Sequence, residues 1–148
     1  MVDIVKEKIV GDVKDGGYFY AISADEVRDV SNKEQLAVCI RFPDKSDSIR
    51  EEFLTFVDVS SDTSGERLSE EILGVLDSVD LDKHQMRGQC YDGAGNMTGK
   101  VKGVGPRIQR QYPRALPFWC TAHQLNRCVV HACDNKLVRN MMGTVHKV

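Results

Sequence analysis

The 148-residue sequence has no long apolar run, and this absence excludes several classes of protein. No stretch approaches the roughly 20 apolar residues of a membrane-spanning helix. The first residues lack the apolar segment of a secretory signal peptide. The five cysteines are odd in number and irregularly spaced, so we expect no disulfide framework and a reducing compartment, the nucleus or the cytosol. Internal repeats and low-complexity linkers are also absent.

Acidic residues are scarce in the second part of the chain. Residues 1–92 hold 21 of the 22 acids and 11 of the 20 basic residues, whereas residues 93–148 hold one acid, Asp134, and 9 basic residues. This asymmetry suggests a face for a polyanion beside an acidic face that attracts metal ions or is merely solvated. By charge alone, a fold that interleaves the two signs is an equal alternative.

The periodicity of apolar residues predicts a soluble α/β domain, and composition agrees: 41% of residues are hydrophobic and 28% charged. Alternation predicts strands over 18–24, 35–42 and 53–59. Leu68, Ile72, Val75 and Leu76 then recur at helical spacing behind a capping box over 63–66. Further elements are a strand over 84–91, a basic helical stretch over 100–111, a strand over 116–120 and a helix from Ala122 onward, marked by Leu125, Val129, Ala132, Leu137 and Met141.

The order βββαβαβα predicts a mixed sheet with helices on its faces. We assign residues 1–15 to an N-terminal flank and 16–148 to the domain. In an RNase H-like arrangement the fourth strand lies parallel to the first, and ligand sites gather at the carboxyl ends of such strands. Asp25 and Asp92 would then be neighbours.

Asp25 and Asp92 are the candidate catalytic and metal-binding residues. Neighbouring strands lie about 4.8 Å apart, so carboxylates at adjacent strand ends can share one Mg²⁺ or Mn²⁺ ion. Glu26 and Asp29 are alternatives to Asp25, and a plain polar turn is the non-functional interpretation. The segment 92–99, Asp-Gly-Ala-Gly-Asn-Met-Thr-Gly, lacks the Gly-Lys-Ser/Thr ending of a phosphate-binding loop.

Cys120 and His123 form a Cys-x-x-His pair at the junction of a strand and a helix. Zinc is conceivable because Cys128, His131 and Cys133 follow, but no second pair has zinc-finger spacing. We therefore expect a structural role, with a buried thiol and a hydrogen-bonded imidazole. Phe118 and Trp119, just before the pair, are expected in the core rather than stacked on bases.

A run of basic residues is the candidate nucleic-acid surface. No acid interrupts the sequence between residues 93 and 132. Cations in this run could contact DNA phosphates, which would make binding salt-dependent, and a solvated helix face is the alternative. The run consists of Lys100, Lys102, Arg107, Arg110 and Arg114.

Three ordered motifs, over 24–36, 87–99 and 120–126, strongly resemble hAT-superfamily transposases. The resemblance is greatest to domesticated relatives of the zinc finger MYM-type and repressor-of-protein-kinase-inhibitor type, and it covers roughly residues 15–145. It implies an RNase H-like catalytic domain for metal-dependent DNA cleavage and strand transfer, with an Asp, Asp, Glu triad. Asp25 matches the first acid and Asp92 the second, while Cys120 and His123 match the family's Cys-x-x-His motif.

The sequence departs from that family after the Cys-x-x-His motif. The family has a large helical insertion there, followed by the catalytic Glu, whereas Asp134 is the only acid after Asp92. The N-terminal zinc-finger domain of the family is absent too. We therefore expect a domain truncated where the insertion would begin and catalytically silent. The alternatives are a non-catalytic module that binds DNA or protein, self-association included, and a zinc-stabilised regulatory domain. No membrane partner is expected.

Overall fold

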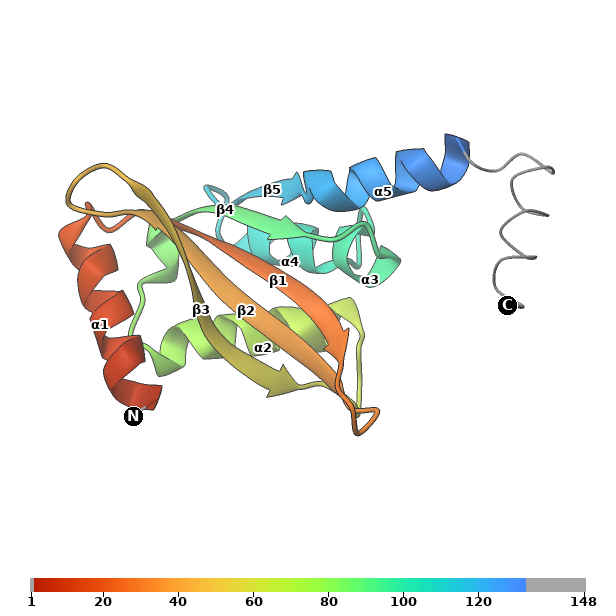
Figure 1. The fold of residues 1–148 in the computed structure, drawn as a ribbon, viewed down its shortest axis with the longest axis horizontal. Coiled ribbons are helices and arrows are strands. Elements are labelled where there is room, and N and C mark those ends of the chain that lie inside the picture. The colour runs from red at the N-terminus through yellow and green to blue at the C-terminus, as the bar shows by residue number, and fades with distance from the viewer. Residues whose placement is uncertain (1, 133–148) are drawn as a thin grey trace, which may run out of the picture.

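The computed structural model describes residues 2–132. Its elements in chain order are α1 (Val2–Asp15), β1 (Tyr20–Arg28), β2 (Glu34–Pro43), β3 (Ile49–Asp58), α2 (Gly65–Ser78), a short 3₁₀ turn (Lys83–Gln85), β4 (Met86–Tyr91), α3 (Gly95–Thr98), α4 (Val104–Gln111), β5 (Leu116–Trp119) and α5 (Thr121–Ala132). The strands form one sheet in the order β3-β2-β1-β4-β5 (Figure 1).

The sheet is mixed, as the sequence predicts. β1, β2 and β3 pair as an antiparallel meander, while β4 lies parallel to β1 and β5 parallel to β4. The two parallel connections run through helices, α2 in the first and α3 with α4 in the second. The predicted α/β class and the parallel pairing of the first and fourth strands are confirmed.

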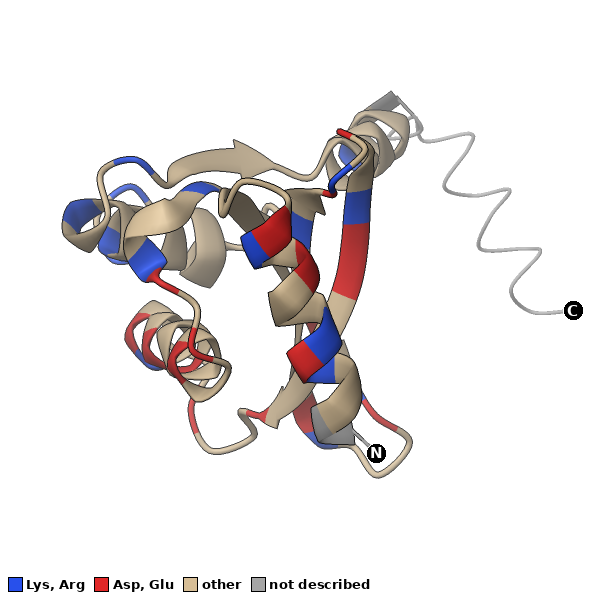
Figure 2. Ribbon diagram, turned by 90° about the vertical axis from the view of Figure 1, so that its left-hand side faces the viewer, with Lys and Arg blue, Asp and Glu red and all other residues tan. Residues whose placement is uncertain are grey.

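The hydrophobic core lies between one face of this sheet and the helices. Because strand residues alternate between the two faces, every second residue of β2 is buried, from Leu36 through Val38 to Ile40. These side chains pack with Leu68 and Ile72 of α2 in one cluster. Figures 1 and 2 show α2 and α4 on the same side of the sheet. We call this side the covered face and the opposite side the open face.

Helix α2 begins one residue later than the predicted capping box implies. Ser64, rather than Thr63, is the N-cap, and its hydroxyl accepts a hydrogen bond from the Arg67 amide at 3.3 Å. The Thr63 carbonyl instead accepts from the Asn96 side chain at 3.0 Å. Thr63 therefore ties the start of α2 to α3.

Two features at the N-terminal end differ from the predicted elements. The segment 2–15 forms helix α1, which the sequence analysis did not assign, and its Ile9, Val10 and Val13 join the core. Strand β1 also continues past its predicted end, because its pairing with β2 persists to Arg28 opposite Glu34. Asp25 consequently lies within β1 rather than after it.

The C-terminal end of the described chain is more exposed than the sequence suggests. Phe118 and Trp119 were expected in the core, yet they are 57% and 41% exposed. This expectation was wrong: β5 is an edge strand, so only one neighbouring strand, β4, flanks these side chains. The predicted last helix begins as α5, whereas Leu137 and Met141 lie outside the described residues. None of the helices within residues 2–132 is long and apolar enough to cross a membrane.

Candidate metal site on the open face of the sheet

The pairing of β1 with β4 brings Asp25 and Asp92 to one groove. The last paired residues are Ala24 and Tyr91, both buried on the covered face. In parallel strands, the residues that follow a matched pair turn together to the other face. Asp25 and Asp92 accordingly both line a groove of about 670 Å³ on the open face.

The floor of this groove is built from small side chains and neutral thiols. Ser23 lies between Cys39 of β2 and Cys90 of β4, since it pairs with both residues. Burial raises the pKa of the Cys39 thiol and that of the Cys90 thiol, and the charge of Glu51 raises both further. The thiols are therefore protonated at neutral pH, and the carboxylates carry the chemistry of the groove.

The two carboxylates differ in how firmly they are held. Asp92 is half-buried, and its Oδ1 accepts a hydrogen bond from the Ala94 amide at 3.1 Å. This turn orients the side chain at the entrance to α3 and leaves Oδ2 available. Asp25 is exposed on its strand. The ordered carboxylate of Asp92 and the freer carboxylate of Asp25 can therefore bind one cation between them.

The two alternatives to Asp25 have other partners. Glu26 accepts a hydrogen bond from the Asn96 side chain at 2.8 Å. Burial raises the pKa of Glu26, the bond from Asn96 opposes this rise, and the nearby charge of Asp92 adds to it. Asp29 accepts from the amides of Ser31 and Lys33 at 2.7 and 2.9 Å and so closes the turn between β1 and β2.

Helix α5 covers the turn that follows Asp92. A Cβ added to Gly93 would lie 2.9 Å from Arg127 Nη1 and 3.4 Å from the His123 ring. Both side chains of α5 therefore lie against this turn. The sequence analysis did not single out Arg127. Its spacing of four residues from His123, which puts both on one helix face, was the available signal.

Cys120 and His123 lie at the junction that the sequence predicts, but they are only half-buried. Both line the groove with Asp25 and Asp92. The Cys120 amide donates to the Tyr91 carbonyl at 2.9 Å, which extends the pairing of β4 with β5 into α5. Within residues 2–132, no three His, Cys, Asp or Glu side chains converge in a way that could hold a metal ion. The four cysteines of this part of the chain are free thiols.

A buried polar network supports β4 beneath the groove. The Gln89 amide donates to the carbonyls of Gly105 and Ala115 at 3.0 and 2.9 Å, and the Tyr91 hydroxyl donates to Gln89 Oε1 at 2.9 Å. Burial raises the pKa of Tyr91 well above its ordinary value, so it remains a donor. The network joins β4 to α4 and to the start of β5. The sequence analysis missed it, because a glutamine inside a short strand carries no recognisable pattern.

The candidate nucleic-acid residues separate into two groups. Arg107 Nε donates to the Lys102 carbonyl at 3.1 Å, and the Arg110 guanidinium donates to the Val101 carbonyl. These side chains gather around the loop between α3 and α4, as does Lys100 in that loop. Figure 2 shows the Lys and Arg residues of α4 on the covered side of the sheet, away from the open face. We call Lys100, Lys102, Arg107 and Arg110 the cationic patch.

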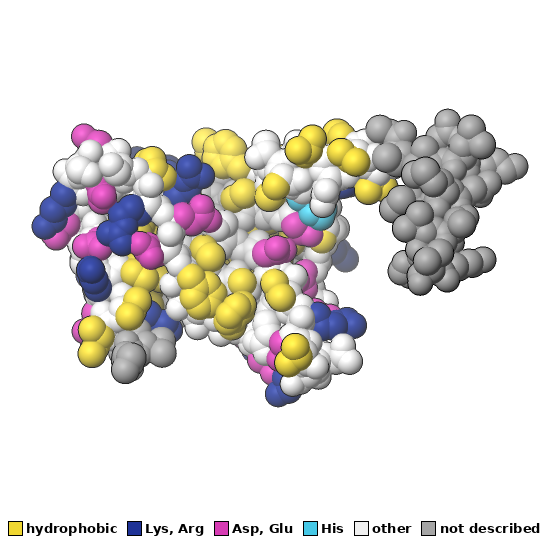
Figure 3. All heavy atoms as spheres, viewed as in Figure 1, with side chains coloured by type: hydrophobic (Ala, Val, Ile, Leu, Met, Phe, Trp, Pro, Cys, Tyr) yellow, Lys and Arg dark blue, Asp and Glu magenta, His cyan; other side chains and the backbone are white. Residues whose placement is uncertain are grey.

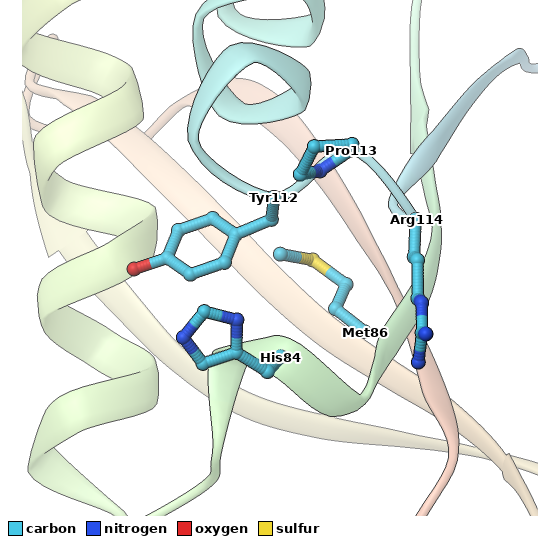
Figure 4. Close-up of a pocket in the computed structure, with 5 residues that line it drawn as sticks. All are labelled: His84, Met86, Tyr112, Pro113 and Arg114. Carbon is cyan, nitrogen blue, oxygen red and sulfur yellow. The ribbon is translucent and has the colours of Figure 1, made fainter.

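Arg114 lies at the other end of α4. It lines a small cavity of about 190 Å³ with Met86, and beside them the Tyr112 ring meets His84 edge-on at 5.3 Å between centroids. In Figure 4 the Arg114 side chain extends along β4, away from the His84 and Tyr112 rings. Arg114 is thus apart from the cationic patch.

Comparisons with known proteins place this geometry in a family context. Residues 2–103 match the ZMYM1/FAM200, RNase-like domain family, a match that includes Asp25 and Asp92. The chain is also 29% identical, over 150 aligned residues, to the human and mouse proteins called 52 kDa repressor of the inhibitor of the protein kinase. The alignment covers 97% of the chain and 19% of each relative, so the chain spans about a fifth of their length.

Proposed function

This chain belongs to the ZMYM1/FAM200 RNase-like domain family, and we propose that it is a transposon-derived domain whose groove binds a divalent cation. Asp25 and Asp92 would hold the ion. The observation that carries this proposal is the parallel pairing of β1 with β4, which ends immediately before both aspartates. An origin in an hAT transposase would explain Asp25 and Asp92 as two remaining acids of a centre for DNA strand transfer.

The chemistry of the two side chains suits a hard cation. Carboxylate oxygens are preferred ligands of Mg²⁺ and Mn²⁺, and Asp92 has one oxygen fixed by Ala94 and one available. Two carboxylates supply only part of the roughly six ligands that Mg²⁺ takes, so water would complete the set and binding would be weak. When bound, such an ion activates a water or hydroxyl nucleophile and stabilises the leaving oxygen. The protein's part is to hold Asp25 on β1 and Asp92 in the turn directly after β4.

We propose that a polypeptide of these 148 residues does not cleave DNA. Two-metal chemistry needs a fixed and complete set of ligands. Asp134 is the only acid after Asp92, and the third acid of the hAT pattern is a Glu. The pair alone therefore binds an ion without arranging it for reaction.

The cleavage proposal is tested by incubating the purified chain with labelled duplex DNA and Mn²⁺, beside an Asp25→Ala variant. We expect no cleavage by either protein. Cleavage by the parent that disappears in Asp25→Ala would contradict the proposal, and would show that another acid within this chain completes the site.

A second candidate function, DNA binding without chemistry, rests on the cationic patch. Only Arg107 in the patch has an ion-pair partner among the described residues, Glu66 at 3.4 Å. Such a surface attracts phosphates regardless of base sequence. A nuclear location fits this role, and the relatives named as repressors are consistent with it.

The test of DNA binding compares a Lys100→Ala, Lys102→Ala double variant with Arg114→Ala. We expect weak binding that falls steeply as salt rises, with a shallower salt dependence in the double variant. Arg114→Ala should change binding less, because Arg114 lies apart from the patch. Equal losses in both proteins would refute the assignment of the patch.

A further inference from the structure

We propose that the open-face groove binds single-stranded nucleic acid, with an unpaired base on the Phe118 ring and backbone phosphates on the His123 and Arg127 face of α5. This inference rests on the proposed cation site, because an ion between Asp25 and Asp92 would offset the acids of the groove. It adds a ligand class and new contact residues to that site. The cationic patch on the covered side of the sheet takes no part in it.

The Phe118 side chain is exposed where a base can reach it. Phe118 lines the groove, is 57% exposed and pairs with Cys90 of the groove floor. One edge of its ring lies against Gly88, because a Cβ added to Gly88 would lie 3.5 and 3.7 Å from the ring atoms Cε2 and Cδ2. The exposed part of the ring borders the groove. Figure 3 shows apolar and acidic side chains together on this face of the sheet. An exposed aromatic ring offers a stacking surface to any base.

Helix α5 presents a cationic face at the carboxyl end of the groove. His123 lines the groove, and Arg127 follows it by about one helical turn on the same face of the helix. Both side chains lie against the turn at Gly93, the residue after Asp92. Arg127 is exposed, and residues 121–132 contain no acid that could pair with it. Its guanidinium is therefore available to donate to phosphate oxygens.

The candidate cation site lies between the aromatic ring and the cationic helix face. Cys90, which pairs with Phe118, precedes Asp92 by two residues and Gly93 by three. At about 3.3 Å per residue, the level of Phe118 and the Gly93 turn are about 10 Å apart along β4 and the turn after it. A nucleic-acid strand that stacks a base on Phe118 and reaches Arg127 therefore passes the cation site.

Charge makes this binding dependent on a divalent ion. The groove carries Asp25, Glu51 and Asp92 against one arginine, Arg41. Without an ion, this net negative charge repels phosphates. An ion of charge +2 between the two aspartates cancels their charge, so that Arg41 and the cationic face of α5 can attract the backbone.

The aromatic ring favours a single strand over two other polyanions. In a duplex the bases are paired and stacked on one another, so none is free to stack on Phe118. An acidic peptide offers carboxylates to Arg127 but no base to the ring. Of these three ligands, only a strand with unpaired bases satisfies the ring, the ion and the guanidinium together.

Fluorescence anisotropy of a labelled single-stranded DNA of mixed sequence tests the proposal. The Lys100→Ala, Lys102→Ala double variant of the full chain is the reference protein, so that the cationic patch contributes little. We expect binding in Mn²⁺ and much weaker binding in EDTA. The duplex of the same sequence and an acidic peptide should compete poorly. Competition by either one as strong as that of the unlabelled single strand would overturn the proposal.

Substitutions of Phe118 test the stacking contact. Phe118→Leu keeps an apolar side chain but removes the ring, so it should weaken single-strand binding at least about fivefold, the loss expected for one stacked base. Phe118→Tyr keeps a ring and should bind as the reference protein does. Phe56→Leu is the matched control, because Phe56 is also 57% exposed but lies on β3, outside the residues that line the groove. Equal losses in Phe118→Leu and Phe56→Leu would refute the contact.

A pair of substitutions with equal charge change tests the phosphate contact. Arg127→Gln and Val129→Glu each lower the net charge by one, but Val129 lies two positions from Arg127 and about 200° around the helix. Arg127→Gln should weaken binding and reduce the slope of log K against log salt by about 0.7, the value for one lost phosphate contact. Val129→Glu should leave this slope unchanged. Equal effects of the two substitutions would contradict a contact at Arg127.

NMR in Mn²⁺ separates failure of this proposal from failure of the cation site, and circular dichroism shows that each variant is folded. Broadening around Asp25 and Asp92 without single-strand binding, or with binding that Phe118→Leu does not weaken, would overturn the strand proposal alone. Strand binding that is equal in Mn²⁺ and EDTA, yet depends on Phe118 and Arg127, would support the strand contacts and contradict the cation site.

Discussion

The two faces of the five-stranded sheet have different roles. The covered face buries residues such as Leu36, Val38 and Ile40 completely beneath helices. The open face carries Asp25 and Asp92, a groove, and exposed aromatic rings. Alternation along each strand separates stability from function, because a change on one face leaves the side chains of the other face in place.

The strongest test of this difference is a valine-to-alanine substitution on each face of the sheet. Val38→Ala removes a fully buried side chain of β2, so it should reduce the free energy of unfolding by about 2–3 kcal/mol through lost burial and a residual cavity. Val27→Ala changes a residue of β1 that is 45% exposed and should cost under about 0.5 kcal/mol. Urea denaturation measures both, and equal losses would show that the open face contributes to the core.

A second matched pair lies within helix α2. A Cβ on Gly65 would lie 2.4 Å from the Lys102 carbonyl oxygen and 2.7 Å from that of Asn96. Gly65→Ala should therefore destabilise the protein by about 1–3 kcal/mol, because backbone must shift. An added Cβ at Gly74 meets nothing within 4 Å, so Gly74→Ala should stabilise the helix by about 0.5–1 kcal/mol. Thermal melting should show a lower melting temperature for Gly65→Ala and a higher one for Gly74→Ala than for the parent.

The strand pattern made the covered face predictable from sequence. Alternation located β2 closely, and helical spacing located α2, because burial on one side leaves a clear period. Helix α1 escaped prediction although Ile9, Val10 and Val13 follow helical spacing, since half of its 14 residues are charged. The first strand was predicted too short, because Asp25 and Glu26 interrupt its apolar pattern while backbone pairing with β2 continues.

The candidate site was less accessible to sequence reasoning than the fold. Asp25 and Asp92 were found through their motifs and through the expected strand order. Arg127 and Gln89 were not, because their positions depend on how α5 and α4 pack. The exposure of Phe118 likewise depends on which elements cover β5, and residue type alone favours a core position for an aromatic ring.

A smaller effect concerns Glu26, whose carboxyl lies near both aspartates. Its pKa is raised in the folded state, so the folded protein binds this proton more tightly than the unfolded chain. Stability should consequently fall as pH rises from the ordinary glutamate pKa through the raised one. Glu26→Gln should remove this part of the pH dependence. Melting temperatures of parent and variant across that pH range test the sign, and parallel curves would contradict it.

Mn²⁺ titration followed by NMR tests the central claim most directly. The ion should broaden the amide signals around Asp25 and Asp92 first, at a concentration that reflects weak binding. Asp92→Asn should reduce this broadening strongly. Asp47→Asn is the control, because Asp47 is exposed in the β2–β3 turn with a positive φ of 59° that asparagine also adopts, and it should broaden as the parent does. Broadening that is unchanged in Asp92→Asn, or centred elsewhere, would contradict the account.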